Sequence, residues 1–387
     1  MKVKKHARSL IQLSALLCTN AWAVSDPQSI KIAEGFSFTP QLEVSERFDD
    51  NFREVNTGRE SSWITRISPT FAIGASSSKV DYRVAYRADS DIFHDSTKDN
   101  NTDHYLTGDL GMRFDSRNKV KFDAGYKRVE ETATLDQRVE NDKYTVSHAG
   151  GMYTYGADSA RGQIELSGDY EELRYQNGQN LNADKERDTT EAISTFYYRV
   201  APKTRALIEG RYTDYSYVSN TRLDASKYAL LGGMEWKASS KTSGSVKIGA
   251  ERKDYDRQGA ESTDSSLWEV GAKWMPKTYS TFEFKTNQSM VPGDDGSSTI
   301  KQKSASLGWE HFWLDRFSTT LRYARVNQEY TDIDRTDKIN VYGIAAKYQM
   351  RRWMDVTLSY NHSQDDSTQE DQAFRRNIYL MSFGFSL

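Results

Sequence analysis

The histidines are the first side chains in this sequence that could carry chemistry. Beyond the amino-terminal segment they are His94, His104, His148, His311 and His362, and they fall on well-separated segments. No G-x-S-x-G or H-E-x-x-H motif accompanies them, so the sequence indicates neither a serine nucleophile elbow nor a zinc-binding helix. We therefore predict no catalytic residue and no enzyme.

Acidic loops are the second candidates. His94 and His104 flank the stretch HDSTKDNNTDH, whose acids could form a weak metal site. The runs DDNF, GDDG and DIDRTD suggest calcium, but none has the spacing of a calcium loop. Solvated loop tips, bridged by divalent ions to lipopolysaccharide, explain these runs better. We expect no metal site and no cofactor.

Charged residues that alternate with apolar ones form the largest group. In SSSKVDYRVAYRADSD, Val80 to Tyr86 point one way at every second position, and Asp81, Arg83 and Arg87 point the other way. The same alternation recurs to the carboxyl end. The opposite parity predicts a polar face made of Glu43, Arg66, Asp81, Arg83, Arg87, Asp109, Arg113, Lys121, Asp123, Lys127, Glu165, Asp169, Arg199, Arg205, Glu209, Arg211, Lys247, Lys273, Glu283, Lys285, Arg322, Asn340 and Lys347.

The ends and composition restrict where such a face can lie. Residues 1–23 have a basic start, a short apolar middle and small residues at Ala21 and Ala23, which is the pattern of a secretory signal peptide. The sole cysteine, Cys18, lies within it. Loss of Lys2, Lys4, Lys5 and Arg8 lowers the formal net charge from -3 to -7, which disfavours nucleic acid as a partner. Beyond the segment no run of apolar residues is long enough for a transmembrane helix.

The alternation positions these charges on β-strands. From residue 36 to residue 387 we count about 18 strands, or 16 if the irregular sixth run, Tyr144 to Tyr155, is miscounted. Connections alternate between tight turns such as APKT and long polar loops such as VPGDDGSSTIKQK. A solenoid would need a repeated side-chain pattern, which the sequence lacks. Two packed sheets would need more apolar residues on each strand face to fill a shared core. The pattern predicts an all-β, antiparallel, up-and-down transmembrane barrel in the bacterial outer membrane, with short periplasmic turns and long extracellular loops.

Aromatic residues support this arrangement. Many lie near predicted strand ends, as expected of girdles at the membrane interfaces: Trp63, Phe93, Tyr105, Tyr212, Trp236, Trp268, Trp274, Trp309, Trp313, Trp353 and Tyr379. Tyr153, Tyr155 and Tyr197 could stack on a glycan if they face inward. The final segment NIYLMSFGFSL resembles the terminal signal read by the barrel-assembly machinery, although it ends in Leu387 rather than an aromatic residue.

A resemblance suggests a function. PQLEVSERFDDNF, SWITRISPTFAI, VDYRVAYRADSDIF and DHYLTGDLGMRFDSRNKVKFDAGYKR are similar to the opening of EpsL-like outer-membrane porins encoded in exopolysaccharide operons. The resemblance implies an exit channel for an exopolysaccharide or capsular polysaccharide, working with a periplasmic polysaccharide-export protein. We expect residues 24–35, a short periplasmic segment, and the tight turns to face that partner. The outer surface would contact lipid and lipopolysaccharide.

Two alternatives remain open at this stage. One is a general or substrate-selective diffusion porin. The other is a surface adhesin or structural barrel with a plugged lumen. In either porin, the polar face would surround a hydrated, slightly cationic lumen. Its mixed charges could instead only pair across neighbouring strands.

Overall fold

The computed structural model describes residues 27–132, 141–178, 182–294 and 296–386. The predicted signal peptide and Leu387 lie outside the described residues. The strands are β1 Ile30–Ala33, β2 Phe36–Asp49, β3 Ser62–Ser76, β4 Val80–Phe93, β5 Asn101–Arg113, β6 Asn118–Glu131, β7 Asp142–Tyr155, β8 Gly162–Tyr175, β9 Arg187–Ala201, β10 Thr204–Tyr217, β11 Ala225–Ser239, β12 Thr242–Tyr255, β13 Thr263–Lys277, β14 Ser280–Pro292, β15 Thr299–Leu314, β16 Phe317–Tyr330, β17 Thr336–Arg351, β18 Met354–Ser367 and β19 Phe374–Ser386.

Short 3₁₀ turns occur only in loops among the described residues: η1 Thr97–Asp99, η3 Ala183–Lys185, η4 Thr221–Leu223 and η5 Glu370–Gln372. No helix in these ranges is long and apolar enough to cross a membrane.

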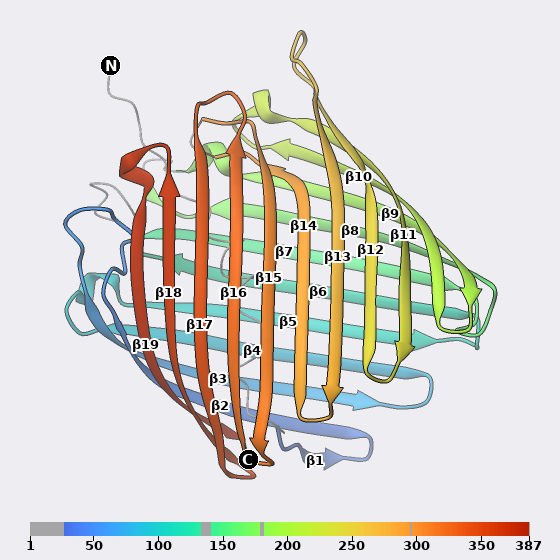
Figure 1. Ribbon diagram of the computed structural model, residues 1–387, viewed down its shortest axis with the longest axis horizontal. Helices are drawn as coiled ribbons and strands as arrows, with labels where there is room; N and C mark the ends of the chain where they lie inside the picture. Colours follow the sequence, from blue (N-terminus) through green and yellow to red (C-terminus); the bar gives the residue numbers. More distant parts are fainter. Residues whose placement is uncertain (1–26, 133–140, 179–181, 295, 387) are drawn as a thin grey trace.

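The strands close into a ring. Each strand from β2 to β19 pairs antiparallel with its sequence neighbours, and β19 returns to β2 from Ile378 opposite Asp49 to Ser386 opposite Gln41. Closure removes the free sheet edges that a bilayer could not satisfy. In Figure 1 the front strands β12 to β18 run steeply across the strands behind them, as expected of a tilted barrel. The prediction of an 18-stranded antiparallel barrel is confirmed, and the alternative of 16 strands is excluded.

β1 lies outside the ring. It pairs with β2 from Ile30 opposite Phe38, beyond the point where β19 stops. The backbone amide of Gln28 donates to the Ser386 hydroxyl at 2.7 Å. The segment ahead of the barrel therefore extends the sheet next to the carboxyl end of the chain, at the end with short turns.

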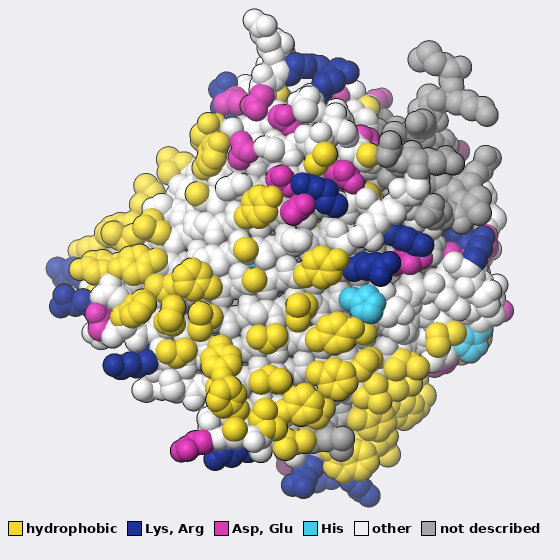
Figure 2. All heavy atoms as spheres, turned by 180° about the vertical axis from the view of Figure 1, so that it is seen from behind, with side chains coloured by type: hydrophobic (Ala, Val, Ile, Leu, Met, Phe, Trp, Pro, Cys, Tyr) yellow, Lys and Arg dark blue, Asp and Glu magenta, His cyan; other side chains and the backbone are white. Residues whose placement is uncertain are grey.

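Two faces alternate along every strand. The outer face carries exposed apolar side chains such as Val84, Leu106, Phe122 and Leu230. Figure 2 shows hydrophobic side chains, in yellow, spread over the side of the barrel that it faces, with charged side chains mostly toward the edges of the view. A surface of exposed apolar residues in a chain of mean hydropathy -0.78 suits contact with lipid.

Three expectations about facing are wrong. The register places Phe93 and Tyr105 on the inner face, opposite Ile64 and Lys127, so neither belongs to an outer girdle. Asn340 instead lies on the outer face, where its side chain accepts a hydrogen bond from Tyr323 at 3.1 Å. At strand ends, and at polar positions outside the hydrocarbon, residue type no longer reports which face a side chain occupies.

The irregular sixth run is an ordinary strand, β7. Tyr153 and Tyr155 are exposed on its outer face, while Tyr144 and Val146 are buried inside. Gly150 and Gly151 at its centre carry no side chain and obscured the parity in the sequence.

The two faces can be tested at adjacent residues of β5. Leu106 is exposed on the outer face, and Thr107 is exposed on the inner face between Ala85 and Gly125. We expect Leu106→Arg to lower the free energy of unfolding in lipid vesicles by about 2–4 kcal/mol, because an arginine near the midplane must be taken from water into hydrocarbon. Thr107→Arg should cost less than about 1 kcal/mol. Denaturant titration measures both, and equal losses would contradict the assignment.

Candidate functional site

The candidate site is the inner wall of the ring, here called the lumen face. It comprises the strand positions that alternate with the exposed apolar ones, as Asp81, Arg83 and Arg87 do on β4. The cross-strand register places every charged residue predicted for the polar face on it.

The lumen face also carries charges that the prediction omitted. Acids on it include Asp49, Asp89, Asp91, Asp103, Glu131, Glu191, Glu235, Glu251, Glu269, Asp355 and Asp365. Additional cations include Arg47, Lys119, Lys227, Lys253 and Arg376. Over the described residues the acids are as numerous as the cations, so the expected cationic excess does not hold for the whole face.

Many of these charges pair across neighbouring strands. Glu209 on β10 is nearly buried and accepts hydrogen bonds from Arg211 Nε at 2.7 Å and from Lys247 Nζ of β12 at 2.9 Å. Arg211 Nη1 also donates to Glu269 of β13 at 2.6 Å. Three strands, β10, β12 and β13, are thus joined by one network, and desolvation makes each of its bonds stronger than it would be in water.

A second network lies beside the β19–β2 closure. Asp91 accepts hydrogen bonds from Arg66 at 2.5 and 2.6 Å and from Arg47 at 2.9 Å. Arg376 of β19 pairs with Asp49 and, at 2.7 Å, with Glu54 of the loop that follows β2. These bonds reinforce the seam where the two ends of the barrel meet.

A cavity of about 400 Å³ adjoins this seam. Arg47, Arg66 and Arg376 line it together with Lys285 of β14 and Arg322 of β16. Glu283 of β14 also lines it and pairs with Lys273 of β13 at 3.1 Å. Gly308 and Gly343 lie in the same wall. The Nε atom of Arg47 is buried there and has no hydrogen-bond partner among the residues that the structure describes. Although Arg47, Arg66 and Arg376 also pair with acids of the wall, a carboxylate entering the cavity could accept hydrogen bonds from the buried Arg47 Nε and from Lys285.

A few lumen charges stay exposed and make no ion pair within the described ranges. The cations among them are Arg83, Arg113, Lys121 and Lys285, and the acids are Asp81 and Asp109. These side chains are available to a passing solute, whereas the paired charges hold the wall together.

Burial along the lumen face changes with depth. On β4, Asp81 and Arg83 are exposed near the short turns, while Asp89, Asp91 and Phe93 are buried near the long loops. Apolar clusters close the same end elsewhere: Val129, Tyr144, Val146 and Leu173 on β6 to β8, and Ala324, Val326, Ile339 and Val341 on β16 and β17. The lumen is open toward the short turns and packed toward the loops.

Two loops contribute to this packing. In the loop after β2, Phe52 packs against Ile64 and Phe93, with 5.3 Å between the Phe52 and Phe93 ring centroids. Arg53 in that loop binds Asp99 of η1 at 2.7 Å. The first part of the loop therefore folds over the lumen, whereas residues 56–61 are exposed.

The loop between β14 and β15 folds inward as well at its described residues, 293–294 and 296–298. The end of β14 that leads into this loop is held at Met290. The Met290 amide donates to Glu251 of β12 at 2.5 Å, and the Met290 carbonyl accepts from Lys227 of β11 at 3.2 Å. Lys253 of β12 is 1% exposed and donates to the Ser298 carbonyl at 3.2 Å and to the Thr299 hydroxyl at 3.0 Å. We call this set the loop anchor.

The tip of the same loop reaches another part of the ring. Asp294 binds Lys185 of η3 at 2.8 Å, and both side chains are largely buried. η3 belongs to the connection between β8 and β9, several strands away from β14. The contact therefore spans part of the mouth and would restrict passage there.

No sequence pattern indicates the loop anchor. Lys227, Glu251 and Lys253 follow ordinary strand alternation, and GDDG reads as a solvated tip. Only the fold brings them together.

Of the tyrosines considered for a glycan track, Tyr197 faces inward, where it is nearly buried under the Arg205 guanidinium at 4.2 Å from its ring centroid.

Releasing the loop tip should widen the pore. Asp294→Asn removes a charge-assisted contact worth about 1.5–3 kcal/mol. We expect large conductance steps in planar bilayers to become about tenfold more frequent, since 1.4 kcal/mol corresponds to a factor of ten. Asp256→Asn, an exposed acid in the β12–β13 loop, is the matched control and should leave the record unchanged. Identical records for wild type and Asp294→Asn would contradict the restriction.

Comparisons with solved structures find outer-membrane channels of the same architecture. A BenF-like porin from Pseudomonas fluorescens Pf-5 aligns with TM-score 0.50 and 10% identity, over 90% of this chain and 99% of that one. Pseudomonas aeruginosa OccK2 (OpdF) in complex with glucuronate aligns with TM-score 0.51 and 10% identity, over 90% and 98%. At such identity the likeness shows the fold alone.

Other comparisons add less. The FrpB iron transporter from Neisseria meningitidis aligns with TM-score 0.48 and 10% identity, over 88% of this chain and 66% of that one. No curated protein sequence matches the chain.

A family model supplies the assignment. It matches residues 27–384, which is nearly the whole described chain. The family and the fold are those of porins, which are channels of the bacterial outer membrane and not enzymes. The chain belongs to the family described as "Putative beta-barrel porin 2".

Proposed function

We propose that the protein is a substrate-selective outer-membrane channel for small hydrophilic solutes that carry a carboxylate, acidic sugars above all. The observation that carries the proposal is the cavity beside the β19–β2 seam, where guanidinium groups from β2, β3 and β19 lie together with Lys285 and Arg322. A general diffusion pore has no need of such a cavity.

The state of the lumen charges supports selectivity. Many acids of the wall pair with cations. Among the exposed lumen charges that make no ion pair in the described part of the chain, the cations Arg83, Arg113, Lys121 and Lys285 outnumber the acids Asp81 and Asp109. An anion that enters from the loop side would meet the arginine-lined cavity first and then the free cations of the open half. Low-dielectric walls focus such a field and raise the local concentration of the counter-ion.

The packed half of the lumen supports the proposal that the solute is small. A hydrated solute that enters from the loops must pass the Asp294–Lys185 contact and the apolar clusters. A monosaccharide fits a cavity of about 400 Å³, and a folded polymer does not. The likeness in fold to a porin solved with glucuronate is in keeping with this class of solute.

Uptake into proteoliposomes tests the proposal. We expect wild-type barrels to admit glucuronate faster than glucosamine. Lys285→Glu and Arg113→Glu should each lower that preference by at least about threefold, because reversing a charge in a focusing cleft changes entry rates by tenfold or more.

The control places the same charge change outside the lumen. Lys303 of β15 is exposed on the outer face, opposite Gln288 and Asn327, so Lys303→Glu should keep the wild-type preference. Equal entry of both sugars into wild-type vesicles would refute selectivity for anions. If only Lys303→Glu lost the preference for glucuronate, the preference would arise from the outer surface and not from the lumen.

Polysaccharide export is the second candidate, favoured by the similarity of the amino-terminal strands to EpsL-like porins and by the open lumen at the short-turn end. A passing chain would require both inward loops to move. The cargo would be an acidic polysaccharide, and a periplasmic export protein would dock at the short turns and at β1. Because β1 continues the sheet along β2 next to Ser386, it offers that partner a rim of ordered backbone.

Deletion of residues 24–35 examines this second candidate. The ring closes through β19 and β2 without β1, so the barrel should still fold and resist heat in detergent. Secreted polysaccharide should fall several-fold, and polymer should accumulate in the periplasm. Normal secretion by the shortened barrel would show that β1 is not part of the docking surface. Normal secretion by a gene-deletion strain would refute the export function altogether.

A further inference from the structure

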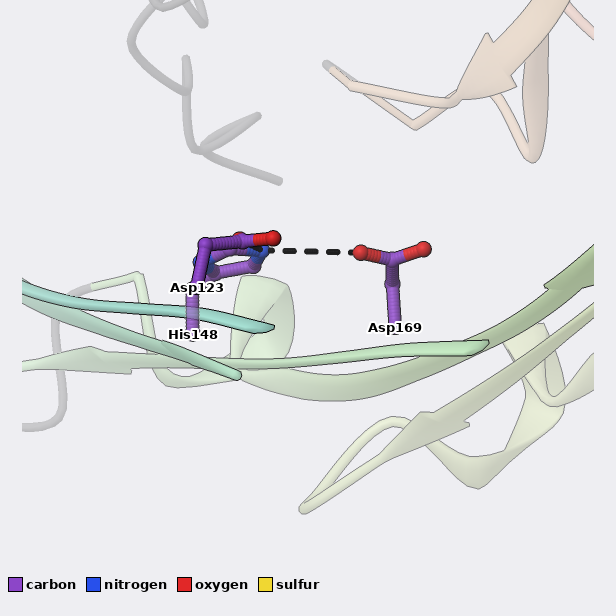
Figure 3. A group of neighbouring side chains, drawn as sticks. All are labelled: Asp123, His148 and Asp169. Carbon is purple, nitrogen blue, oxygen red and sulfur yellow. Dashed lines mark ion pairs between the residues drawn. The ribbon is translucent and has the colours of Figure 1, made fainter. Parts of the chain in front are cut away.

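We propose that Asp123, His148 and Asp169 form a binding site for one divalent transition-metal ion of the zinc type on the lumen face. The three residues come from the neighbouring strands β6, β7 and β8, and their ligand atoms all lie within 4.8 Å of one another. Figure 3 shows Asp123 and His148 side by side, with Asp169 facing them from the next strand.

The register creates the site. Asp123 and Asp169 lie directly opposite the two sides of Gly150 in one row across the sheet, and His148 is on the same face two residues before that glycine. A Cβ atom at position 150 would lie 2.4 Å from Asp169 Oδ1 and 3.1 Å from both Asp123 oxygens. The missing side chain therefore makes room for two carboxylates to converge over the central strand.

The distances suit a small ion. His148 Nε2 lies 3.2 Å from Asp123 Oδ2 and 3.7 Å from Asp169 Oδ1. Ligand atoms about 2.0–2.1 Å from a tetrahedral zinc ion are separated by about 3.4 Å, which falls between the two values. Slight side-chain rotation would place all three atoms on one ion.

The donor set indicates the class of metal. An imidazole nitrogen with two carboxylate oxygens suits zinc and its neighbours among the first-row transition ions, whereas calcium takes six to eight oxygens. Three protein ligands leave a fourth position for water. The side chains of Asp123, His148 and Asp169 are 47%, 35% and 39% exposed, so an ion can reach them from the lumen.

The electrostatic alternative is a protonated imidazole that bridges two acids. Two carboxylates this close repel each other unless a positive charge lies between them. Lys121 of β6 is on the same face, but it makes no ion pair with either acid in the described ranges. A metal ion would bind both carboxylates at once and take the imidazole nitrogen as its third ligand.

Calorimetric titration of the folded full-length barrel in detergent with zinc chloride at pH 7.5 tests the site. We expect one ion per barrel. His148→Ala and Asp169→Asn should each weaken binding at least tenfold, since loss of outer-shell partners alone costs about 10–100-fold in metal affinity. Gly150→Ala should weaken it similarly, because the added methyl group displaces the Asp169 carboxylate.

Controls separate the site from other histidines and from misfolding. His104 lies on the outer face, where its ring contacts the Tyr86 hydroxyl at 2.8 Å, so His104→Ala should bind zinc as wild type does. Heat-modified electrophoretic mobility shows that each variant is folded. Absence of saturable zinc binding by wild type, or unchanged binding by folded His148→Ala, would overturn the proposal. The readout does not depend on which solute the channel conducts.

Discussion

Complete pairing of the backbone is the constraint on which this structure rests. Hydrocarbon offers no hydrogen bonds to amides and carbonyls, so a spanning sheet must have no edge. The β19–β2 ladder supplies closure, and the ion pairs Arg376–Asp49 and Arg66–Asp91 lie beside that seam. Closure in turn fixes which side chains face lipid and which face the enclosed space. Every functional feature discussed above follows from that division.

Closure alone would leave a wide pore, and the interior limits it by two means. Charges such as those around Glu209 link several strands and lie mostly out of reach of a solute. The loops after β2 and β14 fold inward and bury the lumen face near the long-loop end. What remains exposed is an open half with a few free charges and one arginine-lined cavity. Because paired charges and inward loops fill the interior, so polar a chain has a packed interior without a conventional hydrophobic core.

The strands and their faces could be predicted because period-two alternation is a local property. It identified all strands of the ring and placed the charged lumen residues, from Arg66 to Lys347, on one face. The alternation predicted the wrong face for Phe93, Tyr105 and Asn340, because near strand ends an aromatic or polar residue can lie on either face. Within β7, Gly150 and Gly151 have no side chain and so do not indicate a face. The inward loops could not be predicted, because Asp294 and Lys185 meet only through closure of the ring. The row that joins Asp123, Gly150 and Asp169 depends on strand register, which the sequence does not reveal.

The alternation of lipid and water along each strand is the property that most directly distinguishes a membrane barrel from other sheets. The only cysteine of the chain lies in the predicted signal peptide, so single cysteines can be introduced from Asp81 to Arg87 on β4 and labelled in vesicles. A membrane-impermeant charged thiol reagent should modify positions 81, 83, 85 and 87. A fluorophore at 82, 84 and 86 should be quenched by brominated lipid. Uniform labelling or uniform quenching along this stretch would contradict the barrel.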